Sequence, residues 1–203
     1  MTAIDLSEVV CARAEGRIPT ALKRWTTVDE RTRADHLAPR RGSAFLRGRA
    51  LLRGLVADLV GIEPSDVRLV THDGRPVAPA FHVGLSVSHT GDTTVAAARH
   101  AGRIGVDVIA LGTAPGHIPA AACRPEARDA VTAIGLDVHP DLLVWAATEA
   151  VLKGAGCGLT VPLDTLRWDA HDSALEVDGP DVGRWLVDLT CGAGLAVALA
   201  VAD

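Results

Sequence analysis

The stretch that decides the fold runs from Trp145 to Leu159 and reads WAATEAVLKGAGCGL. Its first part is rich in alanine and leucine and predicts a helix, which closely spaced glycines then end in a loop: Gly154, Gly156 and Gly158. Glu149 and Lys153 are four residues apart within this helix. Side chains at that spacing lie on one helix face, so a carboxylate and an ammonium are presented together just before the glycine-rich loop.

An ordinary surface ion pair is the simplest interpretation of Glu149 and Lys153, and such a pair contributes about 0.3–0.5 kcal/mol. The sequence upstream favours a second interpretation, in which both side chains belong to a reactive site. An apolar strand is predicted from Ile104 to Ile109, and it contains a single acid, Asp107. Burying an unpaired carboxylate costs on the order of several kcal/mol. Asp107 is therefore expected either to face water at a sheet edge or to have a charged or hydrogen-bonding partner.

The composition is that of a globular chain with few aromatic residues. Its 203 residues are 48% hydrophobic and 3% aromatic, which suffices for one large domain or two small lobes packed mainly by valine, leucine and alanine. No apolar run reaches the length of a membrane span, and the sequence begins without the apolar core of a signal peptide. The cysteines form no C-x-x-C pair: Cys11, Cys123, Cys157 and Cys191. We therefore expect a soluble protein of the reducing cytoplasm, with no membrane partner.

The basic residues are concentrated in one region, although the net charge is −5. Nine of the twenty Lys and Arg residues lie between positions 23 and 53: Lys23, Arg24, Arg31, Arg33, Arg40, Arg41, Arg47, Arg49 and Arg53. On an acidic chain this cluster favours a local anion site over a nucleic-acid-binding surface, so we expect no nucleic-acid partner. A second interpretation is that these residues form the solvent-facing side of a helix and serve only solubility. The sequence leaves both interpretations open.

The first half of the chain is predicted to hold one long helix followed by strands. Apolar residues recur at helical spacing from Phe45 to Val60, and Gly61 follows as a stop, with arginine on the outer face of the helix. Asp73-Gly74 is a turn signal, and His89 to Asp92 forms a polar break between strands. The predicted strands span 67–70, 83–88, 94–98 and 104–109. Segments 4–13 and 20–33 fit a strand or a helix equally well.

The second half is predicted as two helices and an antiparallel meander. Pro125 opens a helix that runs to Ile134, and the helix of Glu149 follows. Asp178-Gly179 is interpreted as a hairpin turn in the meander, whose strands span 165–170, 174–177, 183–189 and 195–202. Because the two halves have comparable content, we expect an α+β fold of two similar-sized, pseudo-symmetric lobes, residues 1–102 and 103–203, with the site in the cleft between them.

Four short motifs occur in order between residues 74 and 158. They are Gly74-Arg75-Pro76, Ser88-His89-Thr90, Gly105-Val106-Asp107, and Trp145 with Glu149, Lys153, Gly156 and Gly158. This ordered set resembles the Sfp-type 4′-phosphopantetheinyl transferases, whose pattern is a G-K/R-P turn, an S-H-S/T strand end, a G-V/I-D-x-E strand and a W-x-x-K-E-A-x-x-K-x-x-G-x-G helix. The segment from Arg41 to Arg53 also fits the first helix of that family, so the resemblance covers roughly residues 40–160.

The resemblance implies transfer of the phosphopantetheine arm of coenzyme A to a serine of an acyl or peptidyl carrier protein, with release of 3′,5′-ADP. It implies that Asp107 and Glu149 hold Mg²⁺, that Glu149 or a water it orients takes the serine proton, and that Lys153 touches a phosphate near the reacting bond. It further implies that coenzyme A is bound by Arg41, Arg75, Pro76, Ser88 and His89 of the first lobe and by Lys153 of the second. Attack on a pyrophosphate suits these residue types, because it needs a divalent metal and cations to offset charge and a base for the hydroxyl.

Two positions in the motifs depart from the family pattern. The third acid of the D-x-E strand is Ile109 here, as in the smaller holo-acyl-carrier-protein synthases, which carry an apolar residue at that place and use two carboxylates with water. The first lysine of the helix motif is Thr148, so a cation beside the pyrophosphate is missing, a contact worth on the order of a few kcal/mol in the transition state. Cys123-Arg124 also replaces the aromatic residue expected before Pro125-Glu126, which alters the expected carrier-protein surface.

Two hypotheses from different classes follow. The first is a working, Mg²⁺-dependent transferase in fatty acid, polyketide or nonribosomal peptide synthesis. The second, motivated by Ile109 and Thr148, is a catalytically silent or repurposed homologue that binds coenzyme A or a carrier protein as an interaction module. Taken alone, the serine and histidine of the S-H-T motif also fit residues bonded only to their local surroundings. We expect a monomer, because the acids and the nucleotide-binding residues all lie in one chain.

Overall fold

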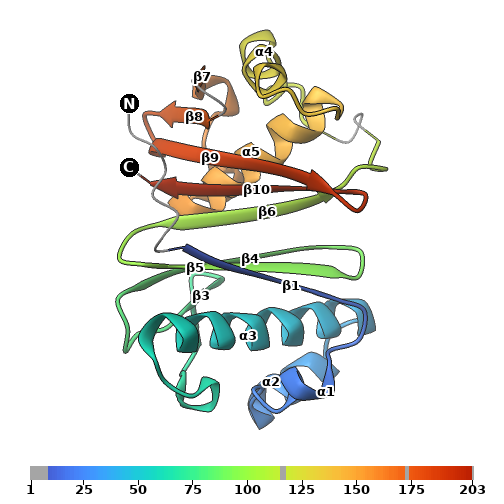
Figure 1. Cartoon of the computed structure of the whole chain (residues 1–203), viewed down its shortest axis with the longest axis vertical. Helices are drawn as coiled ribbons and strands as arrows, with labels where there is room; N and C mark the ends of the chain where they lie inside the picture. The colour runs from blue at the N-terminus through green and yellow to red at the C-terminus, as the bar shows by residue number, and fades with distance from the viewer. Residues whose placement is uncertain (1–8, 115–117, 172–173, 203) are drawn as a thin grey trace. The chain divides into compact units, whose positions relative to one another are not determined.

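The computed structural model describes residues 9–114, 118–171 and 174–202, and helices and strands occur in both halves of the chain (Figure 1). The fold belongs to the α+β class, as expected. The chain divides into two compact units, the first ending at Gly102 and the second beginning at Arg103. Across the described ranges, no helix is long and apolar enough to cross a membrane.

The first unit is built on a three-stranded antiparallel sheet in the order β1-β5-β4, with helix α3 along one face (Figure 1). Its bounds are β1 Val9–Glu15, β4 Val83–Thr90, β5 Thr93–His100 and α3 Pro39–Val60. Ala96 and Ala98 of β5 are fully buried, and a Cβ placed on Gly48 of α3 would lie 3.0 Å from Cγ2 of Val87. Small side chains at this contact let the helix pack closely on the sheet.

Short elements surround this core. They are α1 Thr20–Lys23, α2 Val28–Asp35, η2 Pro64–Asp66, β2 Val70–His72 and β3 Arg75–Val77. Of the two ambiguous segments, 20–33 is helical in α1 and α2, the described part of 4–13 belongs to strand β1, and residues 4–8 lie outside the described residues. The turn predicted at Asp73-Gly74 is confirmed, since both residues have positive φ, 48° and 76°, and join β2 to β3. The strand predicted at 67–70 is wrong, because the carbonyls of Val67 and Val70 accept hydrogen bonds from arginine side chains of α3 and the ladder begins only at Val70.

Helix α3 ends where expected, at Gly61, which caps it with a φ of 73°. The prediction that its arginines lie on the outer face is wrong for Arg47, Arg49 and Arg53, whose exposed fractions are 1%, 7% and 3%. Each guanidinium donates to acceptors of distant segments, including the carbonyls of Gly16, Val70 and Val67. These hydrogen bonds offset the loss of hydration that otherwise keeps arginine at the surface.

The second unit contains a five-stranded antiparallel sheet in the order β6-β10-β9-β8-β7. The strands are β6 Ile104–Ala110, β7 Arg167–His171, β8 Ala174–Gly179, β9 Gly183–Gly192 and β10 Leu195–Ala202. The other elements are α4 Pro125–Ala133, α5 Pro140–Ala155, η4 Gly158–Thr160 and η5 Leu163–Thr165. The predicted order of two helices followed by a meander is confirmed, and α5 packs on one face of the sheet around the fully buried Trp185.

Two predicted turns differ from the structure. β8 continues through Asp178 and Gly179, and residues 180–182 make the turn to β9. Gly179 is buried, and a Cβ on it would lie 2.9 Å from Cδ2 of Leu166, so this glycine serves close packing and not a turn. The polar break predicted from His89 begins too early, because β4 includes both His89 and Thr90.

Candidate functional site

Strand β6 and helix α5 meet backbone to backbone in the second unit. A Cβ placed on Gly105 would lie 1.8 Å from the carbonyl oxygen of Ala150 and 2.7 Å from the amide nitrogen of Gly154. A Cβ on Gly154 would in turn lie 2.5 Å from the ring of Trp185. Only glycine permits these approaches. Because side chains alternate along a strand, Asp107 leaves β6 on the same face as Gly105, the face that packs on α5.

Asp107, Glu149 and Lys153 come together at this contact, and we call them the carboxylate–lysine site. Nζ of Lys153 lies 2.5 Å from Oδ1 of Asp107 and 4.0 Å from Oε2 of Glu149. The Asp107 side chain is only 10% exposed. An acid that simply faces water is therefore excluded, although β6 is the last strand in the order of its sheet.

Burial raises the pKa of Glu149 above its ordinary value of 4.5, Lys153 partly offsets this, and the charge of Asp107 adds to it. The Glu149 side chain is still 23% exposed, so a substrate group has access to it. A carboxylate with a raised pKa is a stronger base than an ordinary one and holds a proton closer to neutral pH. Glu149 is therefore the member of the site best suited to accept a proton.

Two carboxylates around one ammonium also match the oxygen ligands that Mg²⁺ prefers. Among the residues that the structure describes, no group of three or more His, Cys, Asp or Glu side chains is arranged to hold a metal. With only these two carboxylates, a Mg²⁺ ion would need water and substrate oxygens to complete its octahedral shell. Lys153 holds positive charge at this position in the structure, so metal binding would compete with its ammonium.

The positions that depart from the family pattern are buried. Ile109 lies on the same face of β6 as Asp107 and belongs to the apolar core under α5, 8% exposed. Thr148 is fully buried, and its Oγ1 has no hydrogen-bond partner in the described part of the chain. Cys123 is also buried, and burial raises the pKa of its thiol to about 11. Of the pair Cys123-Arg124, only Cys123 is buried, since the Arg124 side chain is 35% exposed, and the effect on a carrier-protein surface stays a prediction.

A cavity of about 340 Å³ lies in the first unit among α2, α3, the β2–β3 hairpin and β4, and we call it the arginine cavity. Arg41, Pro76 and His89 line it, three of the residues that the motifs single out. Arg75 and Ser88 are not among the described residues that line it. Arg75 is exposed, and Ser88 adjoins His89 on β4, so the two side chains leave the strand on opposite faces.

Arg33 of α2 and Phe45 of α3 also line the arginine cavity, and neither was among the predicted site residues. The guanidinium carbons of Arg33 and Arg49 lie 5.1 and 5.4 Å from the centroid of the Phe45 ring. Arg33 and Arg41 give the cavity a cationic wall that suits an anionic ligand, whereas the charge of Arg49 is paired with Glu30. The only signal for Arg33 in the sequence is the excess of basic residues between positions 23 and 53.

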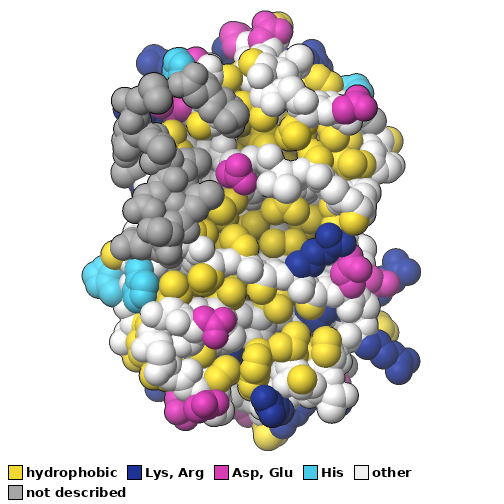
Figure 2. Space-filling model, viewed as in Figure 1, with side chains coloured by type: hydrophobic (Ala, Val, Ile, Leu, Met, Phe, Trp, Pro, Cys, Tyr) yellow, Lys and Arg dark blue, Asp and Glu magenta, His cyan; other side chains and the backbone are white. Residues whose placement is uncertain are grey.

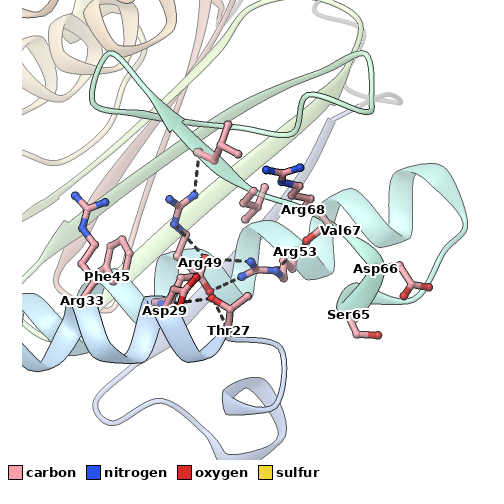
Figure 3. Close-up of a pocket in the computed structure, with 13 residues that line it drawn as sticks. Thr27, Asp29, Arg33, Phe45, Arg49, Arg53, Ser65, Asp66, Val67 and Arg68 are labelled. Carbon is pink, nitrogen blue, oxygen red and sulfur yellow. Dashed lines mark hydrogen bonds and ion pairs between the residues drawn. The ribbon is translucent and has the colours of Figure 1, made fainter.

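A larger cavity of about 470 Å³ shares Arg33, Phe45 and Arg49 with the arginine cavity (Figure 3). Four residues of its polar wall bind one another: Thr27, Glu30, Arg49 and Arg53. Glu30 accepts hydrogen bonds from Nη1 and Nη2 of Arg53 at 2.8 and 3.0 Å, and Nε of Arg49 lies 3.4 Å from the same carboxylate. The paired charges make this cavity a poor second anion site.

The surface charge is mixed in sign. Figure 2 shows acidic and basic side chains interspersed over the face that it draws. Three of the nine clustered basic residues are buried in α3 and not available at the surface: Arg47, Arg49 and Arg53. The basic cluster is therefore partly a structural network and partly the wall of a cavity.

No protein-family model matches the chain, and no curated protein matches it. Function is therefore argued from the two sites themselves, the carboxylate–lysine site of the second unit and the arginine cavity of the first.

Proposed function

We propose that this protein is a 4′-phosphopantetheinyl transferase, which moves the phosphopantetheine arm of coenzyme A to a serine of an acyl or peptidyl carrier protein. The observation that carries the proposal is the meeting of Asp107, Glu149 and Lys153 where β6 touches α5. This set supplies a base, two metal ligands and a cation within one unit. Phosphoryl-group transfer from a pyrophosphate requires these components.

In the proposed reaction the carrier serine attacks the phosphorus that bears the pantetheine arm. A bond forms between the serine oxygen and this phosphorus, the bond to the bridging oxygen breaks, and 3′,5′-ADP leaves with that oxygen. Glu149, or a water that it orients, takes the serine proton, a role that its raised pKa supports. Lys153 contacts phosphate oxygens and offsets the charge that grows on the leaving group.

Asp107 and Glu149 would hold Mg²⁺, with water and pyrophosphate oxygens as the remaining ligands, and the metal would neutralise the pyrophosphate. Lys153 pairs with Asp107 in the structure. Its flexible stem allows the ammonium to move from the carboxylate to a phosphate when substrate enters. In the absence of Mg²⁺, the Lys153 ammonium thus balances the charge of the two carboxylates. When Mg²⁺ and substrate are bound, it binds a phosphate instead.

The arginine cavity supports coenzyme A as the donor. Arg33, Arg41 and His89 line it together, and arginine binds phosphate oxygens with two parallel hydrogen bonds. We also propose Pro76, Arg75 and Ser88 as contacts of the nucleotide. In this proposal residues 1–102 bind the nucleotide of coenzyme A, and residues 103–203 bind the metal. The proposal also includes the architecture of the family that the motifs resemble, in which two pseudo-symmetric lobes enclose the reaction in the cleft between them.

The proposal also includes a carrier protein as the only macromolecular partner, a monomeric enzyme and a cytoplasmic location. The carrier belongs to fatty acid, polyketide or nonribosomal peptide synthesis.

One observation favours the second candidate, a silent or repurposed homologue. Lys153 already provides a cation for Asp107, and the buried Ile109 and Thr148 add no charged group to the site. A chain of this kind would bind coenzyme A or a carrier protein without needing Mg²⁺. The two candidates therefore differ in their dependence on metal.

Intact-protein mass spectrometry of several apo carrier proteins separates the candidates. The carriers are incubated with this protein, coenzyme A and Mg²⁺, with and without a chelator. A working transferase adds one phosphopantetheine, the gain disappears with chelator, and Asp107→Ala and Glu149→Ala each abolish it while circular dichroism stays unchanged. No gain on any carrier, together with calorimetric binding of coenzyme A that is indifferent to Mg²⁺, would favour the silent homologue.

A further inference from the structure

The β2–β3 hairpin is too small to be stable by itself. Its ladder holds three residue pairs, and two-stranded hairpins of this length are marginal in water. Thr71 is paired with Pro76 across the ladder, and Thr71, Gly74 and Pro76 all line the arginine cavity. Whatever anchors the hairpin therefore also sets one wall of the cavity.

Arg49 of α3 supplies such an anchor. Its Nη1 donates to the carbonyl of Val70 at 3.2 Å, and its Nη2 donates to Oγ1 of Thr71 at 2.7 Å. Both acceptors are consecutive residues of β2, so one guanidinium fixes the position and the orientation of the strand. Figure 3 shows Arg49 pointing from α3 toward this strand. A planar guanidinium can bond two adjacent acceptors at once, whereas an ammonium acts as a point charge.

Glu30 of α2 holds Arg49 from the other side. Nε of Arg49 lies 3.4 Å from Oε1 of Glu30, and Arg53 donates to both oxygens of the same carboxylate. Oε2 of Glu30 also accepts from the amide of Thr27, which completes the capping box of α2. The Glu30 carboxylate is thus bound on both oxygens and is only 9% exposed.

Glu30 sets the opposite wall of the cavity through the helix that carries it. Arg33 follows Glu30 by one helical turn, and residues at that spacing share a helix face. Anchoring Glu30 therefore places Arg33 against Phe45, where its guanidinium lies 5.1 Å from the ring. Helix α2 has only eight residues, too few to hold a position without such contacts.

We infer that Arg49, braced by Glu30, is a positioning residue of the arginine cavity. It ties α2 and the β2–β3 hairpin to α3, so that Arg33, Pro76 and His89 line one cavity. The inference rests on the proposed function for the identity of the ligand, coenzyme A. The anchoring of the hairpin by Arg49 is a property of the ligand-free protein and does not depend on which ligand the cavity binds.

A pair of substitutions at Thr71 tests the anchor with little change in shape. Thr71→Val removes the hydroxyl that accepts from Arg49, and Thr71→Ser keeps it. We expect Thr71→Val to weaken calorimetric binding of coenzyme A by about fivefold and Arg49→Lys by about tenfold, with Thr71→Ser within about twofold of the wild type.

Hydrogen exchange of the ligand-free protein distinguishes positioning from direct ligand contact. The backbone amides of residues 70–75 and of Val77 should exchange at least about fivefold faster in Thr71→Val and Arg49→Lys than in wild type or Thr71→Ser. Arg31→Met is the matched control, since Arg31 lies on α2 and, among the hydrogen bonds that the structure describes, its side chain binds only Thr26. It should leave both exchange and affinity unchanged.

The outcomes separate the two proposals. Unchanged exchange in Thr71→Val and Arg49→Lys would overturn the positioning role, and so would equal affinity of wild type and Thr71→Val for coenzyme A. A wild-type protein that binds no coenzyme A would instead overturn the proposed function, and the exchange rates would still decide whether Arg49 anchors the hairpin.

Discussion

The carboxylate–lysine site and the arginine cavity hold charged groups in place by opposite means. In the first, two backbones touch at Gly105 and Gly154, and the charges follow from the strand and helix that carry them. In the second, long side chains of α3 reach across to separate segments and hold them by hydrogen bonds. Backbone contact leaves little room for adjustment, whereas a side-chain tether can be changed one hydrogen bond at a time.

The proposed function of each site accounts for this difference. Metal ligands and a base have to be placed to within a fraction of an ångström, which rigid elements achieve best. A cavity for a flexible, multiply charged ligand tolerates small shifts of its walls. The predictions below probe these two kinds of support, beginning with the largest effect.

Gly105→Ala should disrupt the second unit, because the new Cβ would lie 1.8 Å from a backbone oxygen that cannot move aside. We expect the free energy of unfolding in urea to fall by on the order of 3 kcal/mol or more. Gly48→Ala meets only the methyl group of Val87 at 3.0 Å and gains helix propensity, so its change should stay within about 1 kcal/mol. Gly112→Ala, with no atom within 4 Å of the new Cβ, is the neutral control. A similar loss in Gly105→Ala and Gly48→Ala would remove the contrast between the regions.

Asp107→Asn and Glu149→Gln should both reduce transfer by at least about a thousandfold, but only Asp107→Asn should destabilise the fold. Asp107→Asn leaves Lys153 without its closest carboxylate and should cost about 1–2 kcal/mol in urea unfolding at pH 7. Glu149→Gln removes a charge that burial disfavours and should be neutral or slightly stabilising. Wild-type transfer by either variant would show that its carboxylate is not part of the reaction.

The pH dependence of stability checks the same assignment of Glu149. Its pKa is raised in the folded state, so between 4.5 and the folded pKa the native protein binds more protons at this group than the unfolded chain does. The contribution of Glu149 to stability is therefore complete below pH 4.5 and is lost as pH rises through the folded pKa. The wild type should lose stability relative to Glu149→Gln over that window in urea titrations. A difference that stays constant with pH would contradict the raised pKa.

Arg41→Ala and Arg33→Ala should each weaken coenzyme A binding by about five- to tenfold, because each removes a cation from the wall of the arginine cavity. The loss should shrink as salt is raised from 50 to about 500 mM, since screening weakens exposed charge pairs. Arg31→Ala, on the same helix as Arg33 but outside the lining, is the matched control. Calorimetric affinities equal to wild type in both variants would place the nucleotide elsewhere.

Thr148→Val should give the smallest effect. It replaces a buried hydroxyl that has no hydrogen-bond partner in the described residues, so the free energy of unfolding should stay equal or rise by up to about 1 kcal/mol. Thr148→Lys, which introduces the lysine of the pattern that the motifs resemble, should instead be strongly destabilising, because the ammonium would start from a fully buried position. A stable and more active Thr148→Lys variant would show that α5 can turn this position toward the substrate.

Local signals were enough to predict most elements of the fold. Helical periodicity and Gly61 located α3, proline and alanine located α4 and α5, and Asp73-Gly74 located the β2–β3 turn. The neighbourhood of Glu149 and Lys153 also follows from their spacing on one helix. All these features depend on residues within about one or two turns of each other, which is the range over which sequence patterns act.

Only the tertiary structure decided which charges are buried and with what partner. Arg49 and Arg53 looked like solvent-facing residues of a helix, but acceptors on β2 and Glu30 lie within their reach. Gly179 resembled a turn residue and proved to be a packing contact. The burial of a long polar side chain depends on acceptors far away in the chain, and no local pattern records them.

The same division applies to the site. By itself the sequence determined that Glu149 and Lys153 share a helix face and that a single acid, Asp107, interrupts an apolar strand. The tertiary structure decided that Asp107 pairs with Lys153, because Gly105 lets β6 approach α5 closely enough for the two side chains to meet. Spacing along the chain fixes neighbours within an element, whereas contacts between elements depend on the volumes of the side chains that separate their backbones.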